Sequence, residues 1–424
     1  MRILFLTENF PPETNAVANR VFERARFWAA WGHDVTVITG APNFPQGALY
    51  DGYENKWYQT ETISDVKIVR VKTFIAPNQG TFRRALDFVS FLFSGFAAGL
   101  VVKRPDVVVA TSPQFFTAVA GWLVGVFRRC PFVFEIGDIW PASIVAVEAM
   151  RANVVLRLME KLERFLYRKS ACVVAVTPAF KENLVRRGIE GDKIAVVING
   201  VDLSRFTPLE RDEALAAKWG LKDSFVVGYL GTLGMAHALA NVLDAAEILR
   251  ERPGIKFLLI GSGAERDQLI SSASERRLEN VLFIESQPRE VMPKAWSLCD
   301  VALVHLKNAP AFSEVIPSKI FEAMAMKRPI LIAAPEGVAS RLVAADRAGC
   351  WVPAENPRAL AEAVCRLADD DSLRAELAGN ALAASLKYGR HRQAQEMLQV
   401  LEIADAGWGA RAGIASNDRV SRSL

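Results

Sequence analysis

Short aliphatic or β-branched runs alternate with longer amphipathic stretches along almost the whole sequence, and few folds accommodate such a rhythm. In the first half these runs lie at Ile3–Thr7, Asp34–Thr39, Lys67–Val71, Asp106–Thr111, Phe132–Ile136, Cys172–Thr177 and Ile194–Ile198. The rhythm returns in the second half at Phe225–Leu230, Lys256–Gly261, Val281–Glu285, Asp300–His305 and Ile330–Ala333. Strands that alternate with helices form parallel sheets covered on both faces. The sequence therefore predicts an α/β protein with two doubly wound sheets.

The two series are separated by a loop-like stretch from Asn199 to Pro208, N-G-V-D-L-S-R-F-T-P, which is typical of a linker. A chain of 424 residues also suits two domains of ordinary size. We predict a first domain at residues 1–200 and a second at 201–385. A C-terminal helix at 386–404 is expected to pack back on the first domain. The periodicity is lost after this helix, and residues 405–424 are predicted to be a disordered tail.

Composition excludes several classes of protein. The five cysteines are scattered without a Cys-x-x-Cys pair, which argues against a disulfide framework or a zinc site and favours a cytoplasmic setting. The net charge of +4 is too small to indicate a nucleic-acid binder. The apolar run at the N-terminus is predicted to be a buried strand and not a signal peptide. The acidic triplet Asp369–Asp371 precedes a helical pattern, so a helix cap is favoured over a metal site.

The charge is unevenly distributed between the halves. Residues 1–199 contain 24 Lys and Arg against 18 Asp and Glu, whereas residues 200–424 contain 27 against 29. The basic half also holds two very apolar segments, Leu86–Val102 and Phe115–Phe127, with basic pairs beside them. Both are at or below the roughly 17–25 residues needed to cross a bilayer. They are equally well interpreted as buried helices of an outer layer and as a surface that rests on the inner face of a membrane.

The segment from Phe312 to Ala325, F-S-E-V-I-P-S-K-I-F-E-A-M-A, combines a polar loop with a helix start at about Pro317. Lys319 at such a helix start would add a full positive charge to an anion site and would hold a diphosphate without metal. Glu322, one turn further on, suits ribose hydroxyls, and Glu314 on the loop suits sugar hydroxyls. An ordinary surface loop that leads into a helix explains the segment equally well.

Two glycine turns directly follow predicted strands, at Gly231–Gly234 and at Gly261–Gly263. Glycine permits close approach of the backbone to a ligand, and ligands bind at the carboxyl ends of parallel strands. Together with the segment that contains Glu314 and Glu322, these turns predict a nucleoside diphosphate as ligand.

These motifs resemble those of glycosyltransferase family 4, the retaining enzymes of the GT-B fold that use nucleotide sugars. The likeness extends over nearly the whole chain and is carried by M-R-I-L-F-L-T-E-N-F-P-P-E, V-I-N-G-V-D-L-S-R-F-T-P, V-G-Y-L-G-T-L-G, F-L-L-I-G-S-G-A-E and E-V-I-P-S-K-I-F-E-A-M-A. The resemblance implies two Rossmann-like domains that face a central cleft, the first for the acceptor and the second for the nucleotide sugar. It also implies a UDP-linked donor and no metal cofactor.

The resemblance also assigns roles to individual residues. Glu314 would contact the donor sugar, and Glu322 the ribose. The loop that contains Asn15 and Ala16 would close on the diphosphate, as would the turns at Gly231 and Gly261. The donor-binding candidates are Asn15, Ala16, Gly231, Thr232, His237, Gly261, Lys319 and Glu322. The catalytic candidates are Asp138, Glu314 and Lys319.

The chain departs from the family pattern at several of these places. Many members carry an Arg and a Lys that grip the diphosphate, where this sequence has Thr232, His237 and Ala238. Lys319 is our candidate for the missing cation, and His237 would contribute if protonated. Many members also use a His late in the first domain, where Asp138 is the nearest ionisable group here. Asp138 is predicted to orient or deprotonate the acceptor, with helix capping as an equal alternative.

Within the family, the Asp138-Ile139-Trp140-Pro141 sequence is similar to bacterial surface-polysaccharide transferases, including those that add N-acetyl-fucosamine-type sugars to lipid-linked O-antigen units. The resemblance thus implies a retaining transfer of an N-acetylated amino sugar to a lipid-linked glycan in lipopolysaccharide synthesis. The alternative is a nucleotide-sugar-binding protein or epimerase of the same fold without transferase activity.

Overall fold

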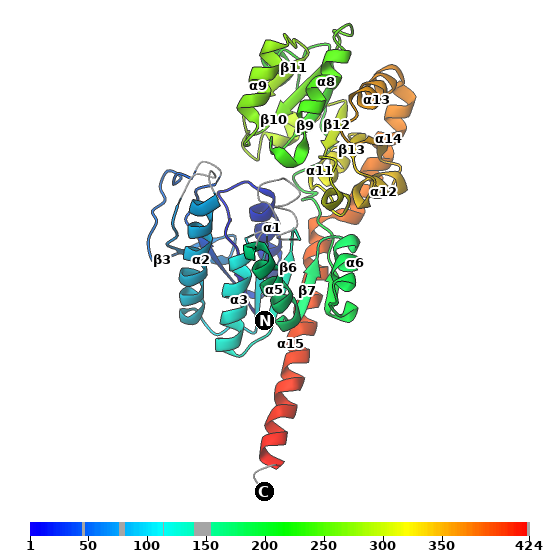
Figure 1. Cartoon of the computed structure of the whole chain (residues 1–424). Coiled ribbons are helices and arrows are strands. Elements are labelled where there is room, and N and C mark those ends of the chain that lie inside the picture. The colour runs from blue at the N-terminus through cyan, green and yellow to red at the C-terminus, as the bar shows by residue number, and fades with distance from the viewer. Residues whose placement is uncertain (45–46, 76–80, 113, 140–153, 422–424) are drawn as a thin grey trace. The chain divides into compact units, whose positions relative to one another are not determined.

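The computed structural model describes residues 1–44, 47–75, 81–112, 114–139 and 154–421 (Figure 1). These residues form two compact units. Unit 1 contains residues 1–139, 154–198 and 391–421, and unit 2 contains residues 199–390. The chain thus leaves unit 1 after Ile198 and returns to it at His391.

Unit 1 is built on an eight-stranded sheet in the order β3-β4-β2-β1-β5-β6-β7-β8. All neighbouring strands are parallel except β3 and β4, which are antiparallel. The strands are β1 (Arg2–Leu6), β2 (Asp34–Gly40), β3 (Tyr58–Ile63), β4 (Val66–Val71), β5 (Val107–Thr111), β6 (Phe132–Ile136), β7 (Cys172–Ala175) and β8 (Ile194–Val196). Its helices are α1 (Ala16–Ala30), α2 (Thr81–Val101), α3 (Phe115–Arg128), α5 (Val154–Lys169), α6 (Pro178–Arg186), the 3₁₀ turn η1 (Gly191–Lys193) and α15 (Arg390–Ser421), whose first residue belongs to unit 2.

Unit 2 contains a six-stranded parallel sheet in the order β11-β10-β9-β12-β13-β14. The strands are β9 (Phe225–Leu230), β10 (Ile255–Ile260), β11 (Val281–Ile284), β12 (Val301–His305), β13 (Ile330–Ala334) and β14 (Gly349–Pro353). The helices are α7 (Glu213–Lys218), η2 (Met235–His237), α8 (Ala240–Ile248), α9 (Arg266–Glu275), α10 (Met292–Ser297), η3 (Pro310–Ser313), α11 (Lys319–Ala325), α12 (Val338–Ala345), α13 (Pro357–Asp369), α14 (Asp371–Ser385) and η4 (Leu386–Tyr388). The fold class predicted from the sequence, two parallel-sheet α/β domains, is confirmed.

The acidic triplet caps a helix, as expected. Asp370 is the N-cap of α14, and its carboxylate accepts a hydrogen bond from the Leu373 N–H at 2.8 Å. Among the described residues, no group of three or more His, Cys, Asp and Glu side chains is placed to hold a metal ion.

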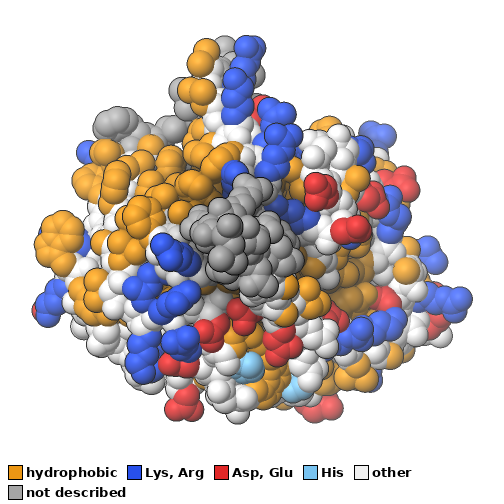
Figure 2. Space-filling view, turned by 90° about the horizontal axis from the view of Figure 1, so that it is seen from below, with side chains coloured by type: hydrophobic (Ala, Val, Ile, Leu, Met, Phe, Trp, Pro, Cys, Tyr) orange, Lys and Arg blue, Asp and Glu red, His pale blue; other side chains and the backbone are white. Residues whose placement is uncertain are grey.

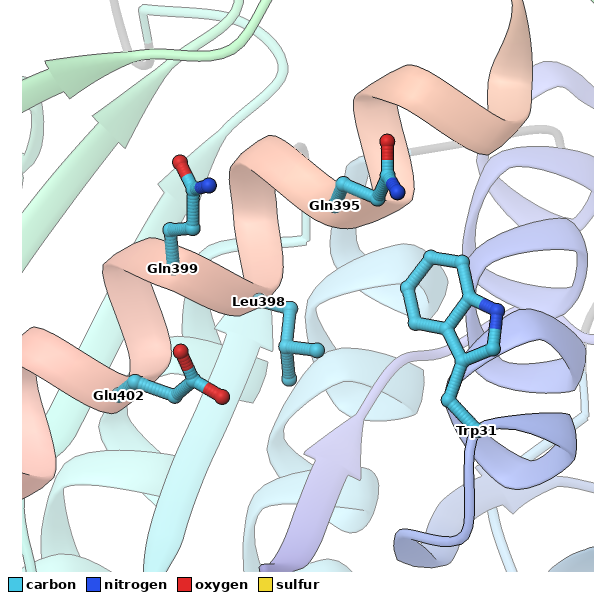
Figure 3. Close-up of a pocket in the computed structure, with 5 residues that line it drawn as sticks. All are labelled: Trp31, Gln395, Leu398, Gln399 and Glu402. Atoms are coloured by element: carbon cyan, nitrogen blue, oxygen red, sulfur yellow. The ribbon is translucent and has the colours of Figure 1, made fainter.

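The C-terminal helix completes the core of unit 1. Ala394, Met397 and Leu401 of α15 are buried in one cluster with Phe5 and Trp28. The Trp28 indole Nε1 also donates a 2.9 Å hydrogen bond to the Ala394 carbonyl. Beside this contact, an open pocket of about 430 Å³ lies between α15 and the end of α1 (Figure 3). It is lined by Trp31, Gln395, Leu398, Gln399 and Glu402. None of the candidate site residues lines it.

The sequence predicts a disordered tail at residues 405–424, whereas in the structure α15 continues as one helix to Ser421. The prediction was based on the loss of hydrophobic periodicity after residue 404. Periodicity reports a buried face, whereas helix propagation requires only residues with adequate helix propensity beyond a formed nucleus. The packed turns at 394–404 supply that nucleus, and no proline follows them.

Helices α2 and α3, which contain the two apolar segments, form part of an outer layer and pack against each other. Each buries one side, with Phe91 and Ala98 of α2 and Val124 of α3 fully or almost fully covered. Each also exposes large apolar side chains: Phe93 is 67% and Phe127 64% accessible. Core burial therefore accounts for only part of their hydrophobicity. No helix in the described part of the chain is both long and apolar enough to span a membrane.

We predict that Leu401→Ala lowers the free energy of unfolding of unit 1 by about 2–5 kcal/mol, because it leaves a cavity in a core that α15 completes. Chemical denaturation followed by tryptophan fluorescence measures the change. Gln399→Ala, at an exposed position of the same helix, is the matched control and should change stability by less than about 0.5 kcal/mol. Equal stability of both variants would contradict a structural role for α15.

Candidate functional site

Two glycine turns meet at the carboxyl edge of the unit 2 sheet, directly after β9 and β10. Gly231 and Gly261 adopt φ values of +147° and +151°, which favour glycine. A Cβ at Gly261 would lie 1.8 Å from the Gly231 carbonyl oxygen. The Gly231 N–H donates to the Ile260 carbonyl at 2.9 Å, and the Leu233 N–H donates to Ser262 at 2.9 Å. The two turns therefore form one closely packed backbone surface.

Lys319, the first residue of α11, points its ammonium group at this surface. A Cβ on Gly231 would lie 3.0 Å from Lys319 Nζ. The ammonium also lies 3.4 Å from the centre of the Tyr229 ring, a cation–π contact. The residue is only 8% accessible, and Nζ has no hydrogen-bond partner within the part of the chain that the structure describes. A buried cation with open donor positions is suited to an anionic ligand.

Burial lowers the pKa of Lys319 to about 7, although the nearby Glu322 carboxylate partly opposes the shift. Glu322 lies on the same helix, and its Oε2 accepts a 3.3 Å hydrogen bond from the Trp296 indole. Glu314 ends η3 and is partly exposed. The structure thus places Glu322 beside Lys319, whereas Glu314 lies on the loop before α11. This helix begins at Lys319, two residues later than the sequence indicated.

His237 does not supply the missing cation in this structure. Burial and the charge of Lys319 lower the pKa of His237 to about 3, so the imidazole is neutral at physiological pH. Its Nδ1 lies 3.1 Å from the His305 carbonyl, and His305 Nδ1 lies 2.7 Å from the His237 carbonyl. Because carbonyl oxygens only accept, both Nδ1 atoms carry the proton. His237 therefore fixes the turn after β9 to the end of β12.

Sequence reasoning missed Tyr229 and His305 as parts of this site. The Tyr229 hydroxyl donates a 2.7 Å hydrogen bond to the carbonyl of Thr232, whose own side chain is exposed. His305 contacts His237 through both its carbonyl and its Nδ1, and its Nε2 lies 2.9 Å from the side-chain amide group of Asn241. Both residues occupy or adjoin the carboxyl end of central strands, and this position was the available signal.

In unit 1, Asn15 and Ala16 lie at the start of α1. The Asn15 side chain accepts a 2.9 Å hydrogen bond from the Ala18 N–H and so caps the helix, while Ala16 is exposed. The loop before them is held by the buried Glu13 carboxylate, which accepts from the Asn43 and Phe44 N–H groups at 2.9 and 2.8 Å. The loop is thereby fixed to the segment after β2.

Asp138 follows β6 at the carboxyl edge of the unit 1 sheet. The Ser112 hydroxyl accepts hydrogen bonds from the Gly137 N–H at 2.8 Å and the Asp138 N–H at 3.3 Å. Burial raises the pKa of Asp138 to about 6, and the charge of Arg20 opposes this increase. A carboxyl group with such a pKa can exchange protons near neutral pH. Trp140 and Pro141, on which the capping alternative depends, lie outside the described residues.

Both halves of the chain match known family models. Residues 17–205 match "Glycosyltransferase Family 4", and residues 211–383 match "Glycosyl transferases group 1". The chain is a GT-B glycosyltransferase. Its fold is similar to that of sucrose-phosphate synthase from Thermosynechococcus elongatus, with a TM-score of 0.78 at 18% identity over 96% of this chain and 99% of that one. Alr3699/HepE of Anabaena, solved with UDP, gives a TM-score of 0.70 at 20% identity over 95% and 100% of the two chains.

Curated relatives of this chain are also named as glycosyltransferases. The putative colanic acid biosynthesis glycosyl transferase WcaI of Escherichia coli K12 is 26% identical over 77% of this chain and 81% of its own length. The N,N'-diacetylbacillosaminyl-diphospho-undecaprenol α-1,3-N-acetylgalactosaminyltransferase of Campylobacter jejuni is 22% identical over 76% and 83% of the two chains. Glycosyl transfer from a nucleotide sugar is therefore the activity of this chain, and the alternative of a fold relative without transferase activity is not supported.

We predict that Gly261→Ala lowers kcat/KM about 100-fold, because its Cβ would displace the Gly231 carbonyl and shift the turn after β9, a candidate for donor binding. Steady-state kinetics with the donor varied measures the loss. Gly254→Ala is the matched control, because a Cβ there meets no atom within 4 Å. If the two variants had the same kcat/KM, the glycine turns would not be part of the donor site.

Proposed function

We propose that the transferase moves an N-acetylated amino sugar from UDP to a lipid-linked glycan, with retention at the anomeric carbon, in the synthesis of a surface polysaccharide such as O-antigen. The observation that carries the donor part of the proposal is the buried ammonium of Lys319, which lies against the Gly231 turn and has no hydrogen-bond partner among the described residues. It provides the positive charge that a diphosphate needs, in a chain that lacks the usual arginine and lysine pair.

The donor diphosphate is proposed to bind on the glycine turns with an oxygen on Lys319 Nζ. An anion at this position raises the pKa of Lys319 from about 7 and so keeps the ammonium charged. Glu322 is proposed to accept hydrogen bonds from the ribose, and Glu314 from the donor sugar. UDP as the nucleotide is supported by the fold relative that was solved with UDP.

The proposed reaction requires little covalent chemistry from the protein. The bond between the anomeric carbon and the β-phosphate oxygen breaks, while the acceptor oxygen bonds to that carbon from the same face. The acceptor proton passes to the departing phosphate, and Lys319 stabilises the negative charge that develops there. Asp138 orients the acceptor hydroxyl or, in place of the departing phosphate, takes its proton. No metal ion is needed for these steps.

The acceptor is proposed to be a glycan on a lipid diphosphate. The Campylobacter jejuni relative carries diphospho-undecaprenol in its name, and WcaI is named for colanic acid biosynthesis. Such acceptors lie at the cytoplasmic face of the inner membrane, so we propose that the transferase works there as a peripheral protein.

The exposed sides of α2, α3 and α5 are the proposed membrane-docking surface. The view from below shows apolar side chains gathered where α2 and α3 lie, with Lys and Arg side chains beside them (Figure 2). Its large exposed apolar residues are Leu86, Phe93, Val101, Val126, Phe127, Val154, Leu158 and Phe165. Rings join the helices in edge-to-face pairs, Phe96 with Phe127 and Trp122 with Phe165.

Some basic residues around this surface bind the ends of its helices, and others provide exposed positive charge. Arg128 donates to the Leu100 and Val102 carbonyls, and Arg104 donates to those of Arg128 and Arg129, so these side chains satisfy the C-terminal ends of α2 and α3. Lys103 and Arg129 are exposed beside them. Each basic residue near an anionic bilayer contributes about 1 kcal/mol to binding.

We predict that Lys319→Met stabilises the ligand-free protein but removes the rise in melting temperature on addition of UDP. The pKa of Lys319 is lower in the folded than in the unfolded chain, so its charge destabilises the folded state. This destabilisation is complete below about pH 7, decreases as the pH rises, and is absent well above pH 10. Turnover should fall about 100-fold. It is measured with UDP-linked N-acetylated amino sugars and a membrane extract, by mass spectrometry of the lipid fraction.

Lys222→Met, at an exposed position of unit 2, is the control and should bind UDP as the wild type does. Normal turnover in Lys319→Met would refute the diphosphate role of Lys319. Absence of any sugar-bearing lipid product with the wild type would refute the proposed acceptor class.

We predict that the protein floats with liposomes that contain phosphatidylglycerol at low salt and is released at about 0.5 M salt, where charges are screened within a few Å. The double variant Phe93→Ser, Phe127→Ser should stay in the soluble fraction. Ile248→Ser, which removes an exposed apolar residue of α8 in unit 2, should float normally. A wild-type protein that remains soluble at low salt would overturn the docking surface.

A further inference from the structure

Two buried arginines of α1 converge on one carboxylate under the carboxyl edge of the unit 1 sheet. Arg20 and Arg24 lie one helical turn apart, and Glu135 lies on β6, all three nearly inaccessible to solvent. Arg24 Nη2 donates a short hydrogen bond to Glu135 Oε1, and Arg20 Nε lies 3.5 Å from the same oxygen. Burial alone would raise the pKa of Glu135, but the two arginines lower it to about 2.

The rest of the Arg20 guanidinium extends past Glu135 toward Asp138. Its Nη2 donates a 3.0 Å hydrogen bond to the Thr111 hydroxyl at the end of β5. The same atom would lie 3.1 Å from a Cβ on Gly137, the residue before Asp138. Glycine at position 137 therefore lets the guanidinium lie against the backbone of the loop that carries Asp138.

Two guanidinium groups contact the Glu135 carboxylate. The charge of Arg20 also acts on the Asp138 carboxyl, whose pKa it lowers against the effect of burial. Within the described part of the chain, Arg20 on α1 is the charged group that acts on Asp138, and Glu135 on β6 pairs with both Arg20 and Arg24. Ser112, after β5, contributes a hydroxyl to the backbone of the same loop.

We infer that Arg20 is a positioning residue, an inference that rests on the proposed function. Its guanidinium, which lies against the backbone of Gly137, keeps Asp138 ionised for work on the acceptor hydroxyl. Arg20 itself touches no substrate in this assignment. Arg24 is the closer partner of Glu135, and Arg20 is the more distant one. If Arg20 served only the stability of unit 1, its hydrogen bond to Thr111 would be sufficient, and the loss of Arg20 would leave the ionisation of Asp138 unchanged.

The experiment measures kcat/KM between about pH 4.5 and 8.5, where the acidic limb reports the ionisation of Asp138. Arg20→Gln should raise the apparent pKa of this limb by about one unit or more, because a nearby opposite charge is lost. Arg20→Lys keeps the charge and should return the apparent pKa of the limb to the wild-type value. Arg26→Gln, which removes the same charge six residues further along α1, should leave the limb in place. If Arg20→Gln does not fold, Glu135→Gln serves instead and should move the limb downward.

A second readout separates this inference from the proposed function. In protein labelled with ¹³C at aspartate carboxyls, the Asp138 signal is identified by its loss in Asp138→Asn, and its titration gives the pKa directly. Full turnover in Asp138→Asn would refute the proposed role of Asp138, while the carbon titration would still decide the effect of Arg20. An Asp138 titration that is the same in the wild type and in folded Arg20→Gln would overturn the inference.

Discussion

Unit 2 contains one unfavourable interaction on which the proposed donor site depends, the burial of the Lys319 ammonium without a hydrogen-bonding partner in the described structure. Desolvation favours the neutral amine, and the Tyr229 ring and Glu322 only partly compensate for it. The glycine turns can approach the ammonium so closely because Gly231 has no side chain. In the proposed complex an anionic oxygen completes this arrangement, so the binding energy of the donor offsets a cost already present in the free protein.

Most of the fold could be predicted from the sequence because buried parallel strands are marked by continuous apolar runs. Two edge strands escaped this criterion. In β3 (Tyr58–Ile63) exposed and half-buried residues alternate, and β14 (Gly349–Pro353) has one fully buried residue. Neither gives the apolar run of a central strand, since each has a neighbour on one side only. The helical course of 405–421 was missed for a different reason, because it requires no buried face.

The candidate site was predictable in its residue types but less so in its protonation. Lys319 and Glu322 are marked by their place in a recognisable segment, and the structure brings them together on α11. The neutral state of His237 follows from burial and from Lys319, which lies 82 positions away in the chain. The influence of Arg20 on Asp138 likewise joins α1 to the end of β6. Such effects depend on tertiary packing, which no local pattern records.

The course of α15 has a consequence for how the protein forms during synthesis. Unit 1 begins at the first residue, yet its core includes Met397 and Leu401. A nascent chain therefore exposes the faces of Phe5 and Trp28 while the ribosome translates all of unit 2, which is complete in sequence by Arg390. Unit 2 has every strand of its sheet available before unit 1 can close its core. The core of unit 1 is therefore complete in sequence only after that of unit 2, in contrast to the usual case in which the N-terminal domain can fold first.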